Sequence, residues 1–376
     1  MKPRILHFTT MGNSLQQRRW IAYFHGLGWT QAIAARHVKG VELSPGVELF
    51  GYGSRLADLA GKVSWRARLR VLDVAVRDIL RRFRPDLIHA HWINGIAHDA
   101  ARTGFHPLVV TPWGSDILIL SRRSAYVERR TRETLRCADI VTCWSELMAE
   151  RCQQLGANPD HCVRMLRGVD VERFRPGLDT TELRRRLGIE QQRVIFSNRR
   201  SREIYNLPTI MRAFGLLART CERVVLLMLV DSQQAASDLQ DLARSLGVEH
   251  RVRIQEWVSH EDLPQFYCVA DVYVSTASSD NLGYSTLEAM ACGTFPVVSD
   301  VGGILEWVTD GKNGFVVPPG NAGALAEAFK MALTSRDLLD RAIRQNRAMV
   351  VNGADYRTEM ARMADRYVKL VRAHGT

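Results

Sequence analysis

The stretch from Ser278 to Gly320, SSDNLGYSTLEAMACGTFPVVSDVGGILEWVTDGKNGFVVPPG, carries more structural information than any other part of the chain. Its pattern predicts a short loop, a helix that begins near Leu287, and a buried strand directly after it. The first amides of a helix have no partner within the helix and carry the positive end of its dipole, so they bind anions. Two carboxylates, Asp280 and Glu288, flank the loop. The stretch therefore predicts a phosphate site.

This stretch resembles the donor-binding segment of glycosyltransferase family 4, which consists of retaining enzymes with the GT-B architecture. The family has two acids at this spacing, an aromatic–glycine loop, and a run like LEAMACGTFPVV. The first acid is usually Glu in the family and is Asp280 here, so the carboxylate is kept on a shorter side chain. The alternative is an ordinary strand–helix–strand edge with two solvated acids.

Strand and helix patterns alternate along the chain, which indicates parallel sheets covered by helices on both faces. A length of 376 residues suits two domains. The resemblance implies two Rossmann-like α/β domains whose parallel sheets face each other across a cleft. Residues 1–170 would bind the acceptor and residues 177–355 the nucleotide-sugar donor. The C-terminal helix, 356–376, would pack back on the first domain.

The donor site of the second domain has a further departure from the family pattern, besides Asp280. Arg200 matches the family's Arg, but Tyr205 stands where the family has Lys, and Tyr brings no charge. Arg199 or Arg202 could supply the missing cation. The resemblance implies that Glu288 binds the ribose and Asp280 the donor sugar. The predicted donor-binding residues are Arg200, Tyr205, Trp257, Asp280, Leu282, Gly283, Tyr284, Ser285 and Glu288.

In the first domain, a predicted strand over 87–90 leads into His91, the position of a family histidine that orients the transferred sugar. We expect His89 on the opposite face of the strand, as a packed core residue. The two histidines are spaced for metal ligation, but no third ligand is evident, so no metal site is predicted. By resemblance, the catalytic residues are His91, Arg200 and Asp280, and the acceptor-binding residues are Gly12, Asn13, Trp113 and Asp116.

The composition of the chain limits the classes of binding partner and the cellular location that we expect. The net charge is +11, and the arginine excess clusters on predicted helices at 64–84 and 122–136. These are either solvated helices or surfaces that dock on an anionic membrane. Seven Cys without paired CxxC spacing indicate free thiols in a reducing cytosol. The absence of a signal peptide and of a membrane-spanning run predicts a cytoplasmic protein or one peripheral to the inner face of the plasma membrane. The lack of zinc-finger or RNA-recognition patterns argues against nucleic acid.

The resemblance implies transfer of a sugar from a nucleoside diphosphate sugar to an acceptor hydroxyl, without a metal or other cofactor. The acceptor would be a glycan, a lipid-linked molecule or a small molecule, in bacterial surface polysaccharide or glycolipid biosynthesis. Two other functions remain open: a catalytically degenerate GT-B scaffold or partner subunit, and a GT-B nucleotide-sugar epimerase. The sugar, base, acceptor, linkage and oligomeric state are left undetermined by the sequence.

Overall fold

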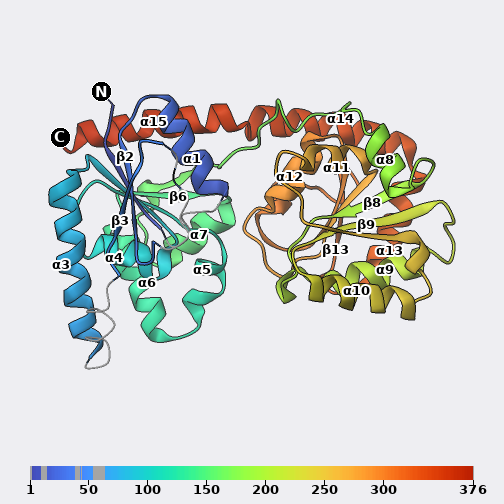
Figure 1. Cartoon of the computed structure of the whole chain (residues 1–376), viewed down its shortest axis with the longest axis horizontal. Helices are drawn as coiled ribbons and strands as arrows, with labels where there is room; N and C mark the ends of the chain where they lie inside the picture. The colour runs from blue at the N-terminus through green and yellow to red at the C-terminus, as the bar shows by residue number, and fades with distance from the viewer. Residues whose placement is uncertain (1, 10–14, 39–42, 44, 54–63, 376) are drawn as a thin grey trace. The chain divides into compact units, whose positions relative to one another are not determined.

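The computed structural model describes residues 2–9, 15–38, 43, 45–53 and 64–375. The chain divides into two compact units (Figure 1). Unit 1 consists of residues 1–168 and 357–376, and unit 2 of residues 169–356. The segments that lead into and out of unit 2 are joined by two backbone hydrogen bonds. The amide of Val169 donates to the carbonyl of Ala354, and the amide of Tyr356 donates to the carbonyl of Val169.

Unit 1 is built on a parallel sheet with seven strands among the described residues, in the order β3-β2-β1-β4-β5-β6-β7. The strands are β1 (Ile5–Phe8), β2 (Gln31–Ala35), β3 (Glu48–Gly51), β4 (Leu87–His91), β5 (Leu108–Thr111), β6 (Ile140–Cys143) and β7 (Cys162–Arg164). The helices are α1 (Leu15–Gly26), α3 (Trp65–Phe83), α4 (His98–Ala101), α5 (Ser115–Leu118), α6 (Ala125–Cys137), α7 (Glu146–Gln154) and α15 (Tyr356–Ala373).

Helices α1 and α15 pack together against the sheet of unit 1. The ring of Phe24 in α1 stacks on that of Tyr367 in α15, with 5.2 Å between the ring centroids. The carboxylate of Glu359 in α15 accepts the amide hydrogen of Leu166, at 2.8 Å. Both Tyr367 and Glu359 are buried, so the C-terminal helix is part of the core of unit 1.

Unit 2 holds a second parallel sheet, with six strands among the described residues in the order β10-β9-β8-β11-β12-β13. The strands are β8 (Arg193–Ser197), β9 (Val224–Val230), β10 (Val252–Glu256), β11 (Val272–Ser275), β12 (Phe295–Ser299) and β13 (Phe315–Val317). The helices are α8 (Thr181–Leu187), α9 (Leu207–Leu217), α10 (Gln233–Ser245), α11 (Leu263–Val269), α12 (Tyr284–Ala291), α13 (Ala322–Thr334) and α14 (Arg336–Gly353).

The sheet of unit 2 is covered on both faces. Helices α9, α10 and α13 lie on one side in Figure 1, and α11, α12 and α14 on the other. Every residue of β9 is buried, as expected of a central parallel strand whose two faces are both covered. The prediction of two α/β units with parallel sheets is confirmed.

The strand order places a switch point in each sheet, where successive strands are added on opposite sides. It lies between β1 and β4 in unit 1 and between β8 and β11 in unit 2. In open α/β sheets, ligands bind beyond the carboxyl ends of the strands at such a point. Ligands are therefore expected to bind at the segments that follow β1 and β4 in unit 1 and β8 and β11 in unit 2.

Candidate active site

The loop before α12 follows β11 at the switch point of unit 2. Gly283 is the N-cap of α12 and has a φ of +68°, a backbone conformation that suits glycine. Gly302 packs so closely on the loop that a Cβ there would lie 2.0 Å from the carbonyl oxygen of Asp280. The side chains of Leu282 and Tyr284 are buried. The loop can therefore offer a ligand its backbone and the polar side chains of Asp280 and Ser285.

A buried arginine stands at this loop. Arg199 follows β8 and is only 8% exposed. Its Nη2 lies 2.5 Å from Oδ2 of Asp280, and its Nη1 donates to Oγ of Ser285 at 2.9 Å. The guanidinium also lies over the ring of Tyr205, 4.1 Å from the ring centroid. From the sequence, Arg199 was one of two candidates for the missing cation, and the structure brings it together with Tyr205, Asp280 and Ser285.

The protonation of Arg199 follows from its surroundings. Burial alone would lower the pKa of the guanidinium, but the charge of Asp280 and the neighbouring hydroxyls more than offset it and raise the pKa above the ordinary value. Arg199 therefore stays charged, and it leaves a fixed positive charge at the start of α12.

Glu288 lies one turn further into α12 and is 5% exposed. His260 Nε2 lies 3.0 Å from one carboxylate oxygen, and the hydroxyl of Tyr267 donates to the other at 3.1 Å. Burial and the charge of Glu288 raise the pKa of Tyr267 well above its usual value, so this hydroxyl keeps its proton. Neither His260 nor Tyr267 was singled out from the sequence, since their spacing from Glu288 has meaning only once α11 and α12 have packed together.

Arg200 and Trp257 form a second feature at the edge of unit 2. Arg200 is exposed, and its guanidinium lies 5.9 Å from the centroid of the Trp257 ring. Trp257, 40% exposed, lines a hollow of about 440 Å³ together with Val230, Asp231 and Gln255. This hollow lies at the carboxyl ends of β9 and β10, so predicted donor residues occupy two neighbouring parts of the same sheet edge.

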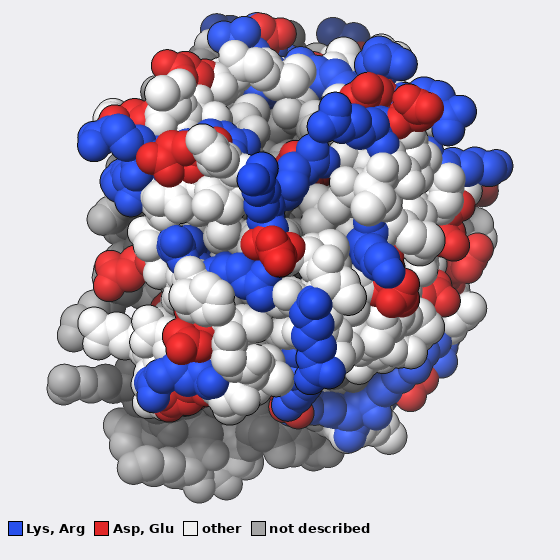
Figure 2. All heavy atoms as spheres, turned by 90° about the vertical axis from the view of Figure 1, so that its right-hand side faces the viewer, with Lys and Arg blue, Asp and Glu red and all other residues white. Residues whose placement is uncertain are grey.

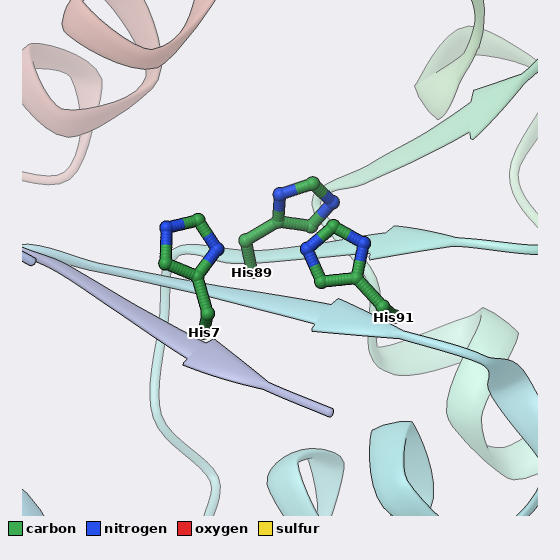
Figure 3. A group of neighbouring side chains, drawn as sticks. All are labelled: His7, His89 and His91. Atoms are coloured by element: carbon green, nitrogen blue, oxygen red, sulfur yellow. The ribbon is translucent and has the colours of Figure 1, made fainter. Parts of the chain in front are cut away.

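In unit 1, three histidines share one face of the sheet (Figure 3). His7 pairs in register with His89, and the ring centroids of His89 and His91 are 3.9 Å apart. The expectation that His89 lies on the opposite face from His91 is wrong, because side chains alternate along a strand and residues two apart share a face. The third histidine, His7, is distant in sequence, and only the pairing of β1 with β4 brings it beside the other two.

Hydrogen bonds and burial define the state of these histidines. His7 Nε2 bonds Gln31, His89 Nε2 bonds Thr111, and His89 Nδ1 bonds Tyr367. Burial lowers the pKa of His7 to about 4, and burial followed by the neighbouring histidines lowers those of His89 and His91 well below the usual value. All three are therefore neutral near pH 7.

Two groups among the described residues bring three potential metal ligands within reach of one another. One nitrogen from each of His7, His89 and His91 lies within 4.8 Å of the others. Both nitrogens of His89 are already bonded to hydroxyls, so an ion there would have to displace Thr111 or Tyr367. The second group, His106, Asp139 and His374, lies nearer the surface.

The residues predicted to bind the acceptor differ in how accessible the structure leaves them. Trp113 is partly buried, with its ring centroid 6.3 Å from that of His91. Asp116 is fully buried, and its oxygens accept the amide hydrogens of Ile93, Trp113 and Gly114. Asp116 thus stabilises the turn after β5, and an acceptor hydroxyl would have to displace these amides. Gly12 and Asn13 lie outside the described residues.

Both basic helices carry exposed arginines. In α3, Arg77, Arg81 and Arg82 are exposed and Val74 is 70% exposed. On the face of unit 2 seen in Figure 2, basic and acidic side chains are interspersed. Within the described ranges, no helix is long and apolar enough to cross a bilayer.

Two family models match the chain. The model described as "Glycosyltransferase Family 4" matches residues 55–173, and the model described as "Glycosyl transferases group 1" matches residues 179–349. The second match contains Arg199, Asp280 and Glu288.

Curated and solved relatives extend over most of the chain. A D-inositol 3-phosphate glycosyltransferase of Geodermatophilus obscurus is 28% identical over 343 residues, which cover 85% of this chain and 75% of the relative. The crystal structure of Anabaena HepE in complex with UDP and glucose has a TM-score of 0.81 at 20% identity, covering 98% of this chain and 100% of the other. Sucrose-phosphate synthase from Thermosynechococcus elongatus has a TM-score of 0.80 at 18% identity, covering 99% and 100%.

Proposed function

Because the chain belongs to glycosyltransferase family 4 and has the GT-B fold, we propose that it transfers a sugar from a nucleoside diphosphate sugar to an acceptor hydroxyl, with retention of the anomeric configuration. The observation that carries the proposal is the pair of acids that flank the start of α12, the partly buried Asp280 and the buried Glu288, both held by hydrogen-bonding partners. Asp280 is held by Arg199, and Glu288 by His260 and Tyr267.

The charges at α12 suit the two ends of such a donor. A diphosphate needs positive charge and hydrogen-bond donors where negative charge develops on the leaving group. Arg199, the amides that begin α12 and the exposed Arg200 supply them. Glu288 then accepts hydrogen bonds from the ribose, and Asp280 from a sugar hydroxyl. The hollow beside Trp257 offers room for the base.

The proposed reaction needs no protein base. The acceptor oxygen attacks the anomeric carbon from the face that the phosphate leaves, and the bond between that carbon and the phosphate oxygen breaks. The leaving phosphate takes the acceptor's proton, so atoms and charge balance. The neutral imidazole of His91 would orient the sugar, a role that requires hydrogen bonding but no charge. We also propose that the reaction is independent of metal ions.

The donor and acceptor classes are proposed from the relatives. HepE is crystallised with UDP and with UDP-glucose, which makes uridine diphosphate sugars the first donors to test. The curated relative acts, by its name, on D-inositol 3-phosphate, an anionic polyol. A phosphorylated polyol therefore joins the glycan or lipid-linked acceptors of surface polysaccharide and glycolipid synthesis. The exposed arginines of α3 and α6 suit an anionic acceptor or the inner membrane face.

The test is thermal stabilisation of the purified protein by UDP-, GDP-, ADP- and dTDP-sugars. Binding to the folded state alone raises the melting temperature. We expect a shift of several degrees with one nucleotide class, and loss of that shift in Asp280→Ala/Glu288→Ala. Sugar transfer to an acceptor would then separate transferase from epimerase, which converts the donor alone. Stabilisation by no nucleotide sugar would contradict the proposal.

A further inference from the structure

The two acids of the donor site are joined by an unbroken chain of side-chain hydrogen bonds. From Arg199 the chain passes to Oγ of Ser285 and then, at 2.7 Å, to the hydroxyl of Tyr273. The hydroxyl of Tyr273 lies 3.1 Å from Oδ1 of Asn198, whose Nδ2 lies 2.8 Å from the hydroxyl of Tyr267. Tyr267 reaches Glu288. The chain thus runs from the Asp280–Arg199 pair to Glu288.

The donors and acceptors of this chain follow from what each group can offer. The carboxylate of Glu288 can only accept, so it receives the single proton of Tyr267. Tyr267 must then accept from Nδ2 of Asn198, and the hydroxyl of Tyr273 has two acceptors within reach, Oγ of Ser285 and Oδ1 of Asn198. Ser285 in turn accepts from Arg199. Asn198 is therefore the centre of the chain, and only one orientation of its amide satisfies both tyrosines.

Burial makes these bonds interdependent. Tyr267 and Tyr273 are fully buried, and Asn198 is 5% exposed. In such surroundings hydrogen bonds are strong and polarise one another, while a partner lost from the chain leaves a costly unpaired group. The members come from β11, α11, α12 and the segment after β8, so the chain locks four segments at the switch point into one arrangement.

We propose that Asn198, Tyr267 and Tyr273 are positioning residues that couple the two ends of the donor site. This inference rests on the proposed function and deepens it. Tyr267 holds Glu288 in place for the ribose, and Tyr273 holds Ser285 and, through it, Arg199 for the phosphates and for Asp280. Asn198 connects the two, so the nucleotide end and the reacting end of the donor are set in one geometry.

The test removes one hydroxyl at a time. In Tyr267→Phe we expect the dissociation constant of the nucleotide to rise about tenfold, with kcat changed less than about twofold, because the displaced group is Glu288. In Tyr273→Phe we expect kcat to fall about tenfold and nucleotide affinity to fall by a smaller factor, because Arg199 serves both the phosphates and Asp280. In kcat/KM, the double variant should lose less than the product of the losses in the two single variants, because both changes break the same chain.

The matched control is Tyr52→Phe in unit 1. Tyr52 is 1% exposed and its hydroxyl donates to the buried carboxylate of Asp99, so the change removes a similar bond outside the donor unit. We expect it to lower the melting temperature like the other two and to leave kcat and nucleotide affinity unchanged. If Tyr267→Phe or Tyr273→Phe fails to fold, Asn198→Ser replaces it, with both nucleotide affinity and kcat expected to fall.

The outcomes separate this inference from the function beneath it. Wild-type protein that binds no nucleotide contradicts the proposed function itself. Active wild-type protein, with both tyrosine variants kinetically indistinguishable from Tyr52→Phe, contradicts the coupling alone. Fully multiplicative losses in the double variant would show two independent contacts and would also overturn the coupling.

Discussion

The two sheets have the same kind of strand order around their switch points, but the buried polar groups there are charged in unit 2 and neutral in unit 1. In unit 2, the switch point holds charged groups with close partners: Arg199 pairs with Asp280, and the carboxylate of Glu288 is hydrogen-bonded by His260 and Tyr267. In unit 1, the switch point holds three histidines that burial keeps uncharged, and two of them, His7 and His89, bond neutral amide and hydroxyl groups.

The difference shows how the buried polar side chains at each edge are stabilised. An isolated charge in the interior is very costly, whereas a paired and hydrogen-bonded one is tolerated. Unit 2 can therefore keep charge ready for an ionic ligand. Unit 1 offers neutral polar groups, which suit the uncharged hydroxyls of a sugar.

The largest expected effects come from the two acids, since they test whether the charged edge performs the chemistry. We expect Asp280→Ala to lower kcat about 100-fold or more, because a contact to the reacting sugar is lost. We expect Glu288→Ala to weaken donor binding by a similar factor while kcat falls less. Steady-state kinetics with the donor identified by thermal shift measures both. Wild-type activity in both variants would remove the assignment of this edge.

The next prediction separates the two neighbouring arginines. Both Arg199→Gln and Arg200→Gln should weaken donor binding, but only the first breaks a largely buried ion pair. We expect Arg199→Gln to lower the free energy of unfolding by about 3 kcal/mol and Arg200→Gln by less than about 1 kcal/mol. Urea unfolding of both variants gives the comparison, and equal losses would mean that the pair with Asp280 does not stabilise unit 2.

The neutral edge of unit 1 predicts acid sensitivity. The pKa of His7 is about 4 in the folded chain and 6.5 in the unfolded chain, so between these values only the unfolded chain binds the proton. Stability is therefore highest above pH 6.5 and falls as the pH drops toward 4, by about 3 kcal/mol for this group. His89 and His91 add to the loss in the same direction.

Urea unfolding at pH 7, 6 and 5 measures this loss. We expect His7→Gln to flatten the dependence of stability on pH, whatever its effect on stability at pH 7. The control is His106→Gln, since the imidazole of His106 is 44% exposed and lies outside the buried group of His7, His89 and His91. An unchanged slope in His7→Gln would mean that His7 does not resist protonation.

The smallest expected effect concerns the ring that covers Arg199. Tyr205→Phe keeps an aromatic face against the guanidinium, whereas Tyr205→Ala removes it. We expect the alanine variant to be less stable than the phenylalanine variant by about 1 kcal/mol. Thermal unfolding of the pair provides the measurement, and equal melting temperatures would show that the stacking contributes nothing.

Much of the fold was predictable because strong local patterns mark it. The strands β8, β9, β11 and β12 contain continuous apolar runs, the pattern that predicts a buried parallel strand. The strands β2, β3 and β7 carry a weaker local signal. β2 is the alanine-rich segment QAIAA and β7 the short segment CVR, and such sequences depend on neighbouring strands for their conformation.

The candidate site divides in the same way. Asp280, Gly283 and Glu288 were identifiable because they lie close together in sequence, on one loop and the helix that follows it. The partners that set their chemistry come from elsewhere: Arg199 after β8, His260 just before α11, Tyr267 in α11, and Tyr273 in β11. No local spacing relates these residues to α12.

The sequence by itself determined the fold class, the family and the positions of the two acids, because each rests on short-range periodicity or a contiguous pattern. Only the tertiary structure decided that Arg199 is the arginine paired with Asp280, that His7 joins His89 and His91, and that Asp116 is occupied by backbone amides. Strand pairing and helix packing create these contacts between distant residues, and the resulting burial sets their charges.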